Sequence, residues 1–179
     1  MNVAKEQPAK KILMLIDWEN LITNMDLPPA ERYSNIEGFD RIIKRISRDV
    51  GEIVNVFVFL SPHLAYSVSE DMYKLGFFTI VCPKIRTKEE EQQDTADGII
   101  IDFGKKMINQ ISGLTHLCLG SGDKDFTPLI REATRKGLKI IILAGNKRSL
   151  SRELSKLADT RENDENEKLI YLLSPQSQE

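Results

Sequence analysis

Acidic residues follow apolar segments at two distant places in the chain. Asp17 comes directly after one such segment, and Asp123 and Asp125 lie in a glycine-rich stretch, residues 120–126, just beyond another. Carboxylates brought within a few ångströms repel one another, and one would take up a proton unless a cation neutralised the group. Because Mg²⁺ and Mn²⁺ prefer oxygen ligands, the pattern predicts a divalent-metal site held by Asp17 and Asp123.

A further carboxylate ligand is expected from residues 89–111, where Asp94, Asp97 and Asp102 precede or line a predicted helix. Asp97 falls at the edge of the helix's apolar stripe, and Asp102 falls on the opposite side, where a solvated acid paired with a lysine is the simpler interpretation. Asp97 is therefore the predicted helix ligand, with Asp94 as its neighbour. At helical spacing the stripe itself contains Ile100, Phe103, Met107 and Ile111.

Each of the strand-end acids also has a purely structural interpretation. Asp17 could cap a helix or lie in a surface loop, and Asp123 and Asp125 could form a turn followed by a helix N-cap. For Asp123 the glycine-rich approach favours metal binding, because small residues let backbone and ligand come close. For Asp125 both interpretations stay open.

Polar and aromatic side chains also occur near these acids or at other strand ends. The amide of Asn20 could orient a ligand water or a scissile phosphate, or it could cap a helix after the first strand. Trp18 could stack on a base or pack in the core. His63 and His116 have no partner in the predicted site, so we interpret both as structural.

Short apolar runs separated by amphipathic stretches predict parallel βαβ units rather than hairpins. Helical spacing predicts a helix over residues 36–49, and two Xaa-Pro starts, Ser61-Pro62 and Thr127-Pro128, are followed by glycine stops at Gly76 and Gly137. Strands are expected at residues 11–16, 53–60, 77–82, 115–119 and 139–143, with a sixth, short edge strand within 168–173.

Near-continuous Val, Ile and Leu runs indicate strands that are covered on both faces, as in a doubly wound parallel sheet. The predicted α/β fold is a three-layer α/β/α domain with a central parallel sheet of strand order 3-2-1-4-5. Strands one and four are then neighbours at the topological switch point. Asp17 and Asp123 should therefore converge in the crevice beyond the carboxyl ends of these strands.

Length and composition fit one globular domain, since 41% of the 179 residues are hydrophobic and 29% are charged. We expect a flexible arm over residues 1–10, the domain over 11–173 and a tail over 174–179, with 160–167 as an exposed loop. The net charge of −2 gives no global attraction to nucleic acid, so such binding would need a local basic rim.

The cysteine residues and the lengths of the apolar runs indicate the cellular compartment of the protein. Cys82 and Cys118 lie in apolar runs without the spacing of a zinc site, so both are expected to be buried thiols. No apolar run is long enough for a signal peptide or a membrane span. These features predict a cytoplasmic protein that does not enter a membrane.

Two motifs carry a resemblance to a known family. The segment Ile16-Asp17-Trp18-Glu19-Asn20-Leu21, together with Gly120-Ser121-Gly122-Asp123-Lys124-Asp125-Phe126, resembles the NYN domain family, in particular its LabA-like branch. The resemblance covers nearly the whole chain, including the acidic helix and residues 154–159, which are similar to the family's closing helix. It implies a PIN-like nuclease fold, a site for Mg²⁺ or Mn²⁺, and RNA as the substrate.

The resemblance also assigns site residues. The positions that match the family's acidic and amide residues are Asp17, Asn20, Asp97, Asp123 and Asp125. Members often carry a further carboxylate along the acidic helix, but Asp102 is out of register with the face that holds Asp97. The aromatic residue common after the late aspartate is also missing, because Thr160 follows Asp159.

We therefore expect a metal-dependent ribonuclease. An ion held by Asp17, Asp97 and Asp123 would activate a water for in-line attack on a phosphodiester of single-stranded RNA. The RNA backbone would be held by a basic rim formed by Lys124, Arg148 and Arg152, which Arg86, Lys88 and Lys147 could extend.

Other functions remain as alternatives to a ribonuclease. One is an inactive RNA- or nucleotide-binding module of the same fold. A receiver-like phosphoacceptor domain is disfavoured, because the third strand ends in Cys82-Pro83-Lys84 where an acceptor aspartate would be required. The sequence does not fix the oligomeric state, and a homodimer stays open.

Overall fold

A six-stranded parallel sheet forms the centre of the molecule. The computed structural model describes residues 9–32, 35–83, 85–86, 92–93, 96–162 and 164–174. Within these ranges the sheet order is β10-β7-β6-β1-β2-β3, which is 3-2-1-4-5-6 in chain order and confirms the predicted topology and edge strand. The strands are β1 Lys11–Asp17, β2 Glu52–Leu60, β3 Phe78–Val81, β6 His116–Gly120, β7 Lys139–Ala144 and β10 Ile170–Leu172.

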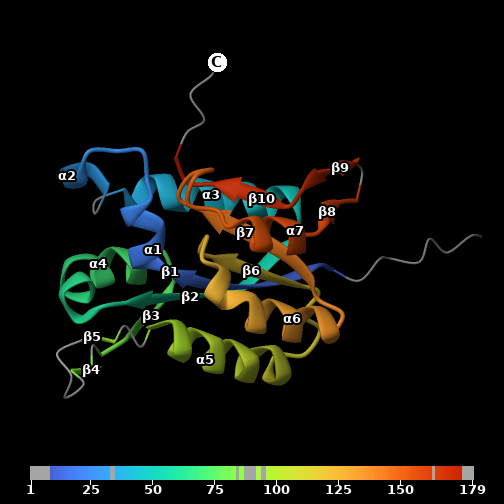
Figure 1. The fold of residues 1–179 in the computed structure, drawn as a ribbon, viewed down its shortest axis with the longest axis horizontal. Coiled ribbons are helices and arrows are strands. Elements are labelled where there is room, and N and C mark those ends of the chain that lie inside the picture. Colours follow the sequence, from blue (N-terminus) through green and yellow to red (C-terminus); the bar gives the residue numbers. More distant parts are fainter. Residues whose placement is uncertain are drawn as a thin grey trace, which may run out of the picture.

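Helices cover both faces of this sheet, as the near-continuous apolar strands predicted. Figure 1 shows α5 and α6 together on one side of it, with α1 and α4 at the end where β1 and β2 finish. One face packs on α1 (Trp18–Thr23), α3 (Ile36–Asp49) and α4 (Pro62–Lys74). The other face packs on α5 (Ala96–Gln110), α6 (Thr127–Arg135) and α7 (Arg152–Leu157).

The glycine ends of two helices and the burial of both cysteines also agree with the sequence predictions. A short helix, α2, spans Pro29–Arg32. Gly76 and Gly137 adopt φ of 78° and 80°, so each ends its helix in the left-handed region as predicted. Cys82 and Cys118 are buried, and neither is in a disulfide with a described residue. In the described part of the chain, none of the helices has the length and apolarity needed to cross a bilayer.

Strand β1 divides the core into two layers by the alternation of its side chains. Met14 and Ile16 belong to the layer beneath α3 and α4, whereas Leu13 and Leu15 belong to the layer beneath α5 and α6. Asp17 continues the second series. The register of β1 therefore directs the Asp17 side chain to the face that carries α5.

Helix α5 packs through a narrower face than the predicted apolar stripe. Its buried residues are Ile100, Gly104 and Ile108, while Phe103 and Met107 flank them and are only partly buried. A Cβ on Gly104 would come within 2.7 Å of Leu15 Cδ1, so the absence of a side chain lets the helix lie close to β1. Asp97 precedes Gly104 by seven residues, close to two turns, and so lies on this same packed face.

Two small antiparallel pairs were not predicted. One joins β4 (Ile85–Arg86) to β5 (Gln92–Gln93), and the other joins β8 (Thr160–Arg161) to β9 (Asp164–Lys168). The expected exposed loop over residues 160–167 was therefore wrong: the segment is a hairpin. All the residues of β9 are exposed, so no alternation of apolar residues marks this strand in the sequence.

A glycine joins two loops at the carboxyl edge of the sheet. Gly122 is buried, and a Cβ built on it would overlap the backbone carbonyl of Ser149 in the loop between β7 and α7. Ser151 N donates to Gly122 O at 2.9 Å across the same contact. We expected the glycine-rich stretch to make room for a ligand; at Gly122 it makes room for a second loop.

This contact predicts that Gly122→Ala lowers the free energy of unfolding by about 1–3 kcal/mol, because two backbones must separate to admit a methyl group. Gly98→Ala is the matched control, since nothing lies within 4 Å of a Cβ at that position in α5. Alanine there should raise stability by up to about 1 kcal/mol through helix propensity. Urea denaturation measures both, and equal effects of the two substitutions would contradict the close contact.

His116 lies at the opposite, amino edge of the sheet and is only 3% exposed. Burial first, and then the positive charges of Lys139 and Lys10, lower the pKa of its imidazole from 6.5 to about 4, against opposing effects of Glu162 and Asp159. Its Nδ1 lies 2.8 Å from Thr115 Oγ1. The ring is therefore neutral in the folded protein at pH 5, where an unfolded chain would hold it protonated.

This pKa difference predicts acid sensitivity. Between the ordinary pKa of 6.5 and about 4, the unfolded chain binds a proton that the folded chain does not, so stability falls as the pH falls. Acidification from pH 7 to pH 5 should cost about 2 kcal/mol through this group alone. Urea denaturation of wild type and His116→Leu at both pH values tests it: the variant should lose less stability, and identical losses would refute the assignment.

Candidate metal centre

Strands β1 and β6 bring their acidic ends to the same edge of the sheet. They are parallel neighbours, with Ile16 paired to Gly120, so Asp17 and the loop that carries Asp123 leave the sheet side by side. Because α5 returns antiparallel to the strands, its first turn, which contains Asp97, lies at this edge too. The predicted meeting of distant acidic segments is confirmed at the level of the elements that carry them.

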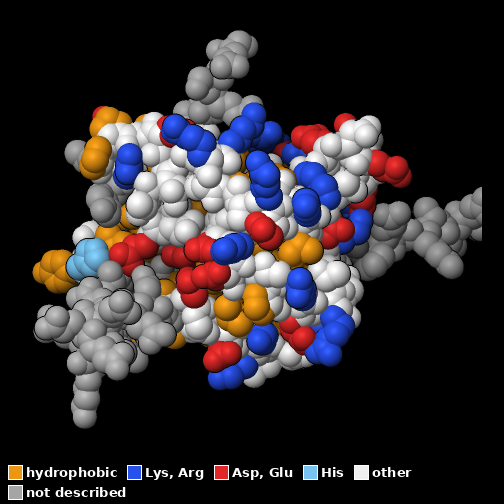
Figure 2. Space-filling model, in the orientation of Figure 1, with side chains coloured by type: hydrophobic (Ala, Val, Ile, Leu, Met, Phe, Trp, Pro, Cys, Tyr) orange, Lys and Arg blue, Asp and Glu red, His pale blue; other side chains and the backbone are white. Residues whose placement is uncertain are grey.

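Three carboxylates form a cluster at this edge. One oxygen from each of Asp97, Asp123 and Asp125 lies within 4.8 Å of the others. Mg²⁺ binds oxygen at about 2.1 Å, so ligand oxygens on opposite sides of one ion are about 4.2 Å apart. The spacing and the hard, anionic donors therefore fit a divalent cation. Figure 2 shows Asp and Glu side chains gathered in one patch at the side where the strands end.

Backbone contacts hold the Asp123 carboxylate in place. Asp123 is the N-cap of a short 3₁₀ helix, η1 (Lys124–Phe126), and its Oδ1 accepts a hydrogen bond from Asp125 N at 3.0 Å. Its own N–H donates to Ser121 Oγ at 3.2 Å. Asp123 is thus both a helix N-cap and a member of the cluster. The cap engages one oxygen of its carboxylate and so fixes the position of the other.

Among the described residues, no cation pairs with two of the three acids of the cluster. Asp97 and Asp123 are half-buried, and Asp125 is exposed. Within the described ranges, neither Asp123 nor Asp125 forms an ion pair. Their charges are therefore available to an external cation.

Asp17 has a different environment from the other predicted ligands. It is only 9% exposed, and its Oδ1 accepts a hydrogen bond from Asn20 N at 3.1 Å as the N-cap of α1. It lies outside the group of three formed by Asp97, Asp123 and Asp125. The structure thus replaces Asp17 by Asp125 in the tight cluster and places Asp17 at the end of the adjacent strand.

Asn20 connects the two acidic motifs. Its side-chain Oδ1 accepts a hydrogen bond from Gly122 N at 3.2 Å, so the amide fixes the loop that leads to Asp123. Among the described residues none accepts a hydrogen bond from its Nδ2. Asn20 therefore positions the glycine-rich loop and still offers a donor at the site.

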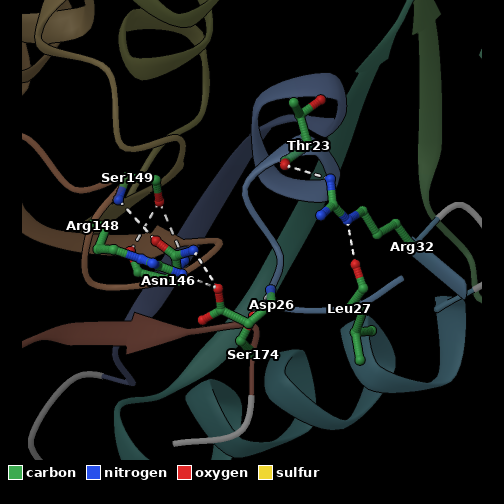
Figure 3. Close-up of polar contacts among 8 residues, drawn as sticks. All are labelled: Thr23, Asp26, Leu27, Arg32, Asn146, Arg148, Ser149 and Ser174. Carbon is green, nitrogen blue, oxygen red and sulfur yellow. Dashed lines mark hydrogen bonds and ion pairs between the residues drawn. The ribbon is translucent and has the colours of Figure 1, made fainter. Parts of the chain in front are cut away.

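The predicted basic residues divide into paired and unpaired groups. Arg148 Nη2 donates to Asp26 Oδ1 at 2.7 Å, and Asn146 Nδ2 donates to the same oxygen at 3.0 Å (Figure 3). These bonds tie the β7–α7 loop to the segment after α1. Lys124 and Arg152 are exposed and form no ion pair with a described residue. Asp94, Lys88 and the side chain of Arg86 lie outside the described part of the chain.

The structure decides between the alternatives for two further side chains. Trp18 is fully buried and packs edge to face on Phe39, with ring centroids 5.0 Å apart, so it cannot stack on a base. Asp102 is exposed, on the side of α5 away from the packed face that carries Asp97. Both agree with the structural interpretations.

One residue at this edge was missed. His63, interpreted as lacking a partner, has Nε2 at 3.9 Å from Glu19 Oε1, and Ser61 Oγ lies 3.1 Å from its Nδ1. Glu19 is two residues from Asp17, so the histidine borders the acidic edge. The signal was present in the sequence, because β1 and β2 were predicted neighbours and His63 follows the end of β2.

Comparison with solved structures supports the fold. A crystal structure of a protein of unknown function from Vibrio parahaemolyticus superposes with a TM-score of 0.69 at 18% identity, covering 97% of this chain and 98% of that one. The overlap with MurG from Acinetobacter baumannii is looser, with a TM-score of 0.45 and 10% identity over 93% of this chain and 47% of that one, and it is too loose to bear on the fold. No curated protein matches the sequence.

One protein-family model matches most of the domain. The model that describes the NYN domain matches residues 11–163, from the first residue of β1 into the β8–β9 hairpin. The match includes both strand-end motifs and the acidic helix, and the sheet order and three layers agree with it. The chain belongs to the NYN domain family.

Proposed function

We propose that this protein is a ribonuclease that hydrolyses phosphodiester bonds of single-stranded RNA with the help of Mg²⁺ or Mn²⁺. The observation that carries the proposal is the cluster of Asp97, Asp123 and Asp125 at the carboxyl edge of the sheet of a NYN domain, a family whose members are generally nucleases. The motifs at residues 16–21 and 120–126 further support placement in the LabA-like branch. Two buried cysteines that are expected to be reduced thiols support a cytoplasmic location.

The residues of the cluster have separate roles in this proposal. Asp97, Asp123 and Asp125 would hold the ion, and Asp17 is the candidate for a further ligand, as predicted from its strand-end position. When bound, a divalent ion supplies an activated water and charge neutralisation at the phosphate. Asn20 keeps the Asp123 loop in position through Gly122 N and directs its amide donor to the substrate.

Lys124 and Arg152 would contact the RNA backbone. Both are exposed and neither has an acidic partner among the described residues, so each retains its charge for a phosphate. Lys124 stands between two acids of the cluster in sequence, and Arg152 begins α7, whose preceding loop packs on Gly122. A bound strand would thus have cations beside the site of cleavage while the acids hold the metal.

An RNA-binding module without turnover is the second candidate. One observation favours it: Asp17 and Asp123 each have a carboxylate oxygen engaged with a backbone N–H, as expected for acids that position loops. The two candidates agree on metal and RNA binding and differ only in whether phosphodiester bonds are hydrolysed.

The proposed metal site predicts a thermal shift without any substrate. Mn²⁺ at one hundred times its dissociation constant should stabilise the wild type by about 2.7 kcal/mol. Asp123→Asn should abolish most of this gain, whereas Asp102→Asn, an exposed acid on the same helix as Asp97, should retain it. Differential scanning calorimetry with and without EDTA gives the answer, and equal Mn²⁺ effects on the two variants would exclude the cluster as the site.

The proposed activity predicts metal-dependent cleavage of labelled single-stranded RNA. Asp97→Asn and Asp123→Asn should each lower the rate at least about 100-fold, since even residues that only orient metal ligands cost 10–100-fold. EDTA should stop the reaction and Mn²⁺ should restore it, while Asp102→Asn should cleave like the wild type. Cleavage that survives Asp123→Asn would count against the site, and tight RNA binding without cleavage in any metal would favour the binding module.

A further inference from the structure

A groove lies beside the free edge of the central sheet, between α7 and β10. Its volume is about 600 Å³, within the about 300–1,000 Å³ typical of ligand clefts. The apolar side chains that line it are Leu150, Ile170 and Leu172, all of them partly exposed. The groove is therefore an apolar surface that the described residues leave open to solvent.

The rim of this groove is positively charged. Lys147, Arg152 and Lys156 line it, are exposed and form no ion pair with a described residue. Lys168 also lines it, but its Nζ donates to Ala158 O at 2.6 Å and so caps α7. Cations thus gather here although the chain carries a net charge of −2. Figure 2 shows Lys and Arg side chains ranged beside the acidic patch on this face of the molecule.

The one acidic residue of the groove lining is engaged elsewhere. Glu167 Oε2 lies 3.0 Å from Arg161 Nε, which belongs to the hairpin at the amino edge of the sheet. Its charge is compensated there and does not neutralise Lys147, Arg152 or Lys156. An anionic ligand is consequently the complementary occupant of the rim.

The groove lies next to the loop that carries Asp123 and Asp125. Ser149 and Leu150 pack against Gly122, and Ser151 N donates to Gly122 O, so the groove wall begins one residue from Asp123. Ser151 then caps α7 through Leu154 N at 3.2 Å, which sets the direction in which Arg152 and Lys156 follow. The loop that carries Asp123 and the wall of the groove are thus in direct contact through Gly122 and Leu150.

We propose that this groove binds the nucleotides that flank the scissile phosphate of single-stranded RNA. The inference rests on the proposed function and adds a second subsite to it. Phosphates contact Lys147, Arg152 and Lys156, and base faces cover the apolar floor of Leu150, Ile170 and Leu172. Because that floor is aliphatic, and Ser155 is the one neutral hydrogen-bonding side chain among the described lining residues, the subsite should accept any base with little discrimination.

Fluorescence anisotropy of a labelled twelve-nucleotide RNA tests the rim. The protein is the full chain with Asp123→Asn, in EDTA, so that no cleavage occurs. Adding Lys147→Glu, Arg152→Glu and Lys156→Glu should weaken binding at least tenfold. Because three phosphate contacts are lost, the slope of log K against log salt concentration should also fall in magnitude by about 2. The corresponding glutamine variants, with a smaller loss, serve if the glutamate variant does not fold.

A matched control reverses the same number of charges on the opposite face. Arg41→Glu, Lys44→Glu and Arg48→Glu alter exposed residues of α3, which packs on the other side of the sheet. These changes should alter RNA affinity less than twofold. Photocrosslinking with 4-thiouridine should label residues 147–156 and 168–172. If both sets of substitutions weaken RNA binding equally, or if the crosslinks are confined to other segments, the proposal that the groove binds RNA is overturned.

The outcomes separate this inference from the proposed function. If the wild type cleaves RNA in Mn²⁺ and the groove variant matches it in affinity and in KM, the groove proposal fails and the ribonuclease stands. If the groove variant loses affinity but no metal supports cleavage, the subsite stands on a binding module. Displacement of the RNA by poly-glutamate as efficiently as by unlabelled RNA would identify a surface for acidic proteins and overturn the assignment to RNA.

Discussion

Mutual repulsion among carboxylates is the constraint on which this architecture depends. Two like charges 4 Å apart cost about 1 kcal/mol even in water, and Asp97, Asp123 and Asp125 all lie within 4.8 Å of one another. Packing in the core and hydrogen bonds to the backbone must therefore hold the acids together. The close packing of Gly104 on Leu15 fixes α5, and with it Asp97, while the cap to Asp125 N fixes Asp123. The ordered core thus stabilises an arrangement that the charges alone would disperse.

Separation of cations from this cluster is the second requirement. A lysine ammonium among the carboxylate oxygens would neutralise the acids and compete with a metal. Lys124 is exposed and forms no ion pair with a described acid, and the other basic residues stand nearby on another element. The β7–α7 loop meets this need, because Gly122 holds one side of it and Asp26 holds Arg148 on the other. Arg152 and Lys156 then follow on α7. Under the proposed function, the acids and Lys124 on one loop, with further cations on its packed neighbour, would give a polyanion both a metal and a positively charged path.

Much of this arrangement was predictable, because apolar periodicity reports burial and burial fixes the elements. The helix at residues 36–49, the strand order and the meeting of β1 with β6 all followed from that pattern. Contacts between loops carry no periodicity, so the packing of Gly122 on Ser149 was missed. The proximity of His63 on α4 to Glu19 on α1 was also missed, although the order of β1 and β2 implied it. The β8–β9 hairpin was missed for a related reason: β9 buries no residue, so it leaves no alternation to detect.

The exchange of Asp125 for Asp17 in the cluster has a geometric cause and a functional consequence. Asp125 is two residues from Asp123 on a cap that forces them together, whereas Asp17 depends on the spacing of two strands and is engaged with Asn20 N. Exposure also rises from Asp17, which is buried, through the half-buried Asp123 to the exposed Asp125. Solvent, and with it any phosphodiester, therefore reaches the cluster from the Asp125 side. Lys124 is exposed on the same short helix, so the substrate would meet a cation as it meets the acids.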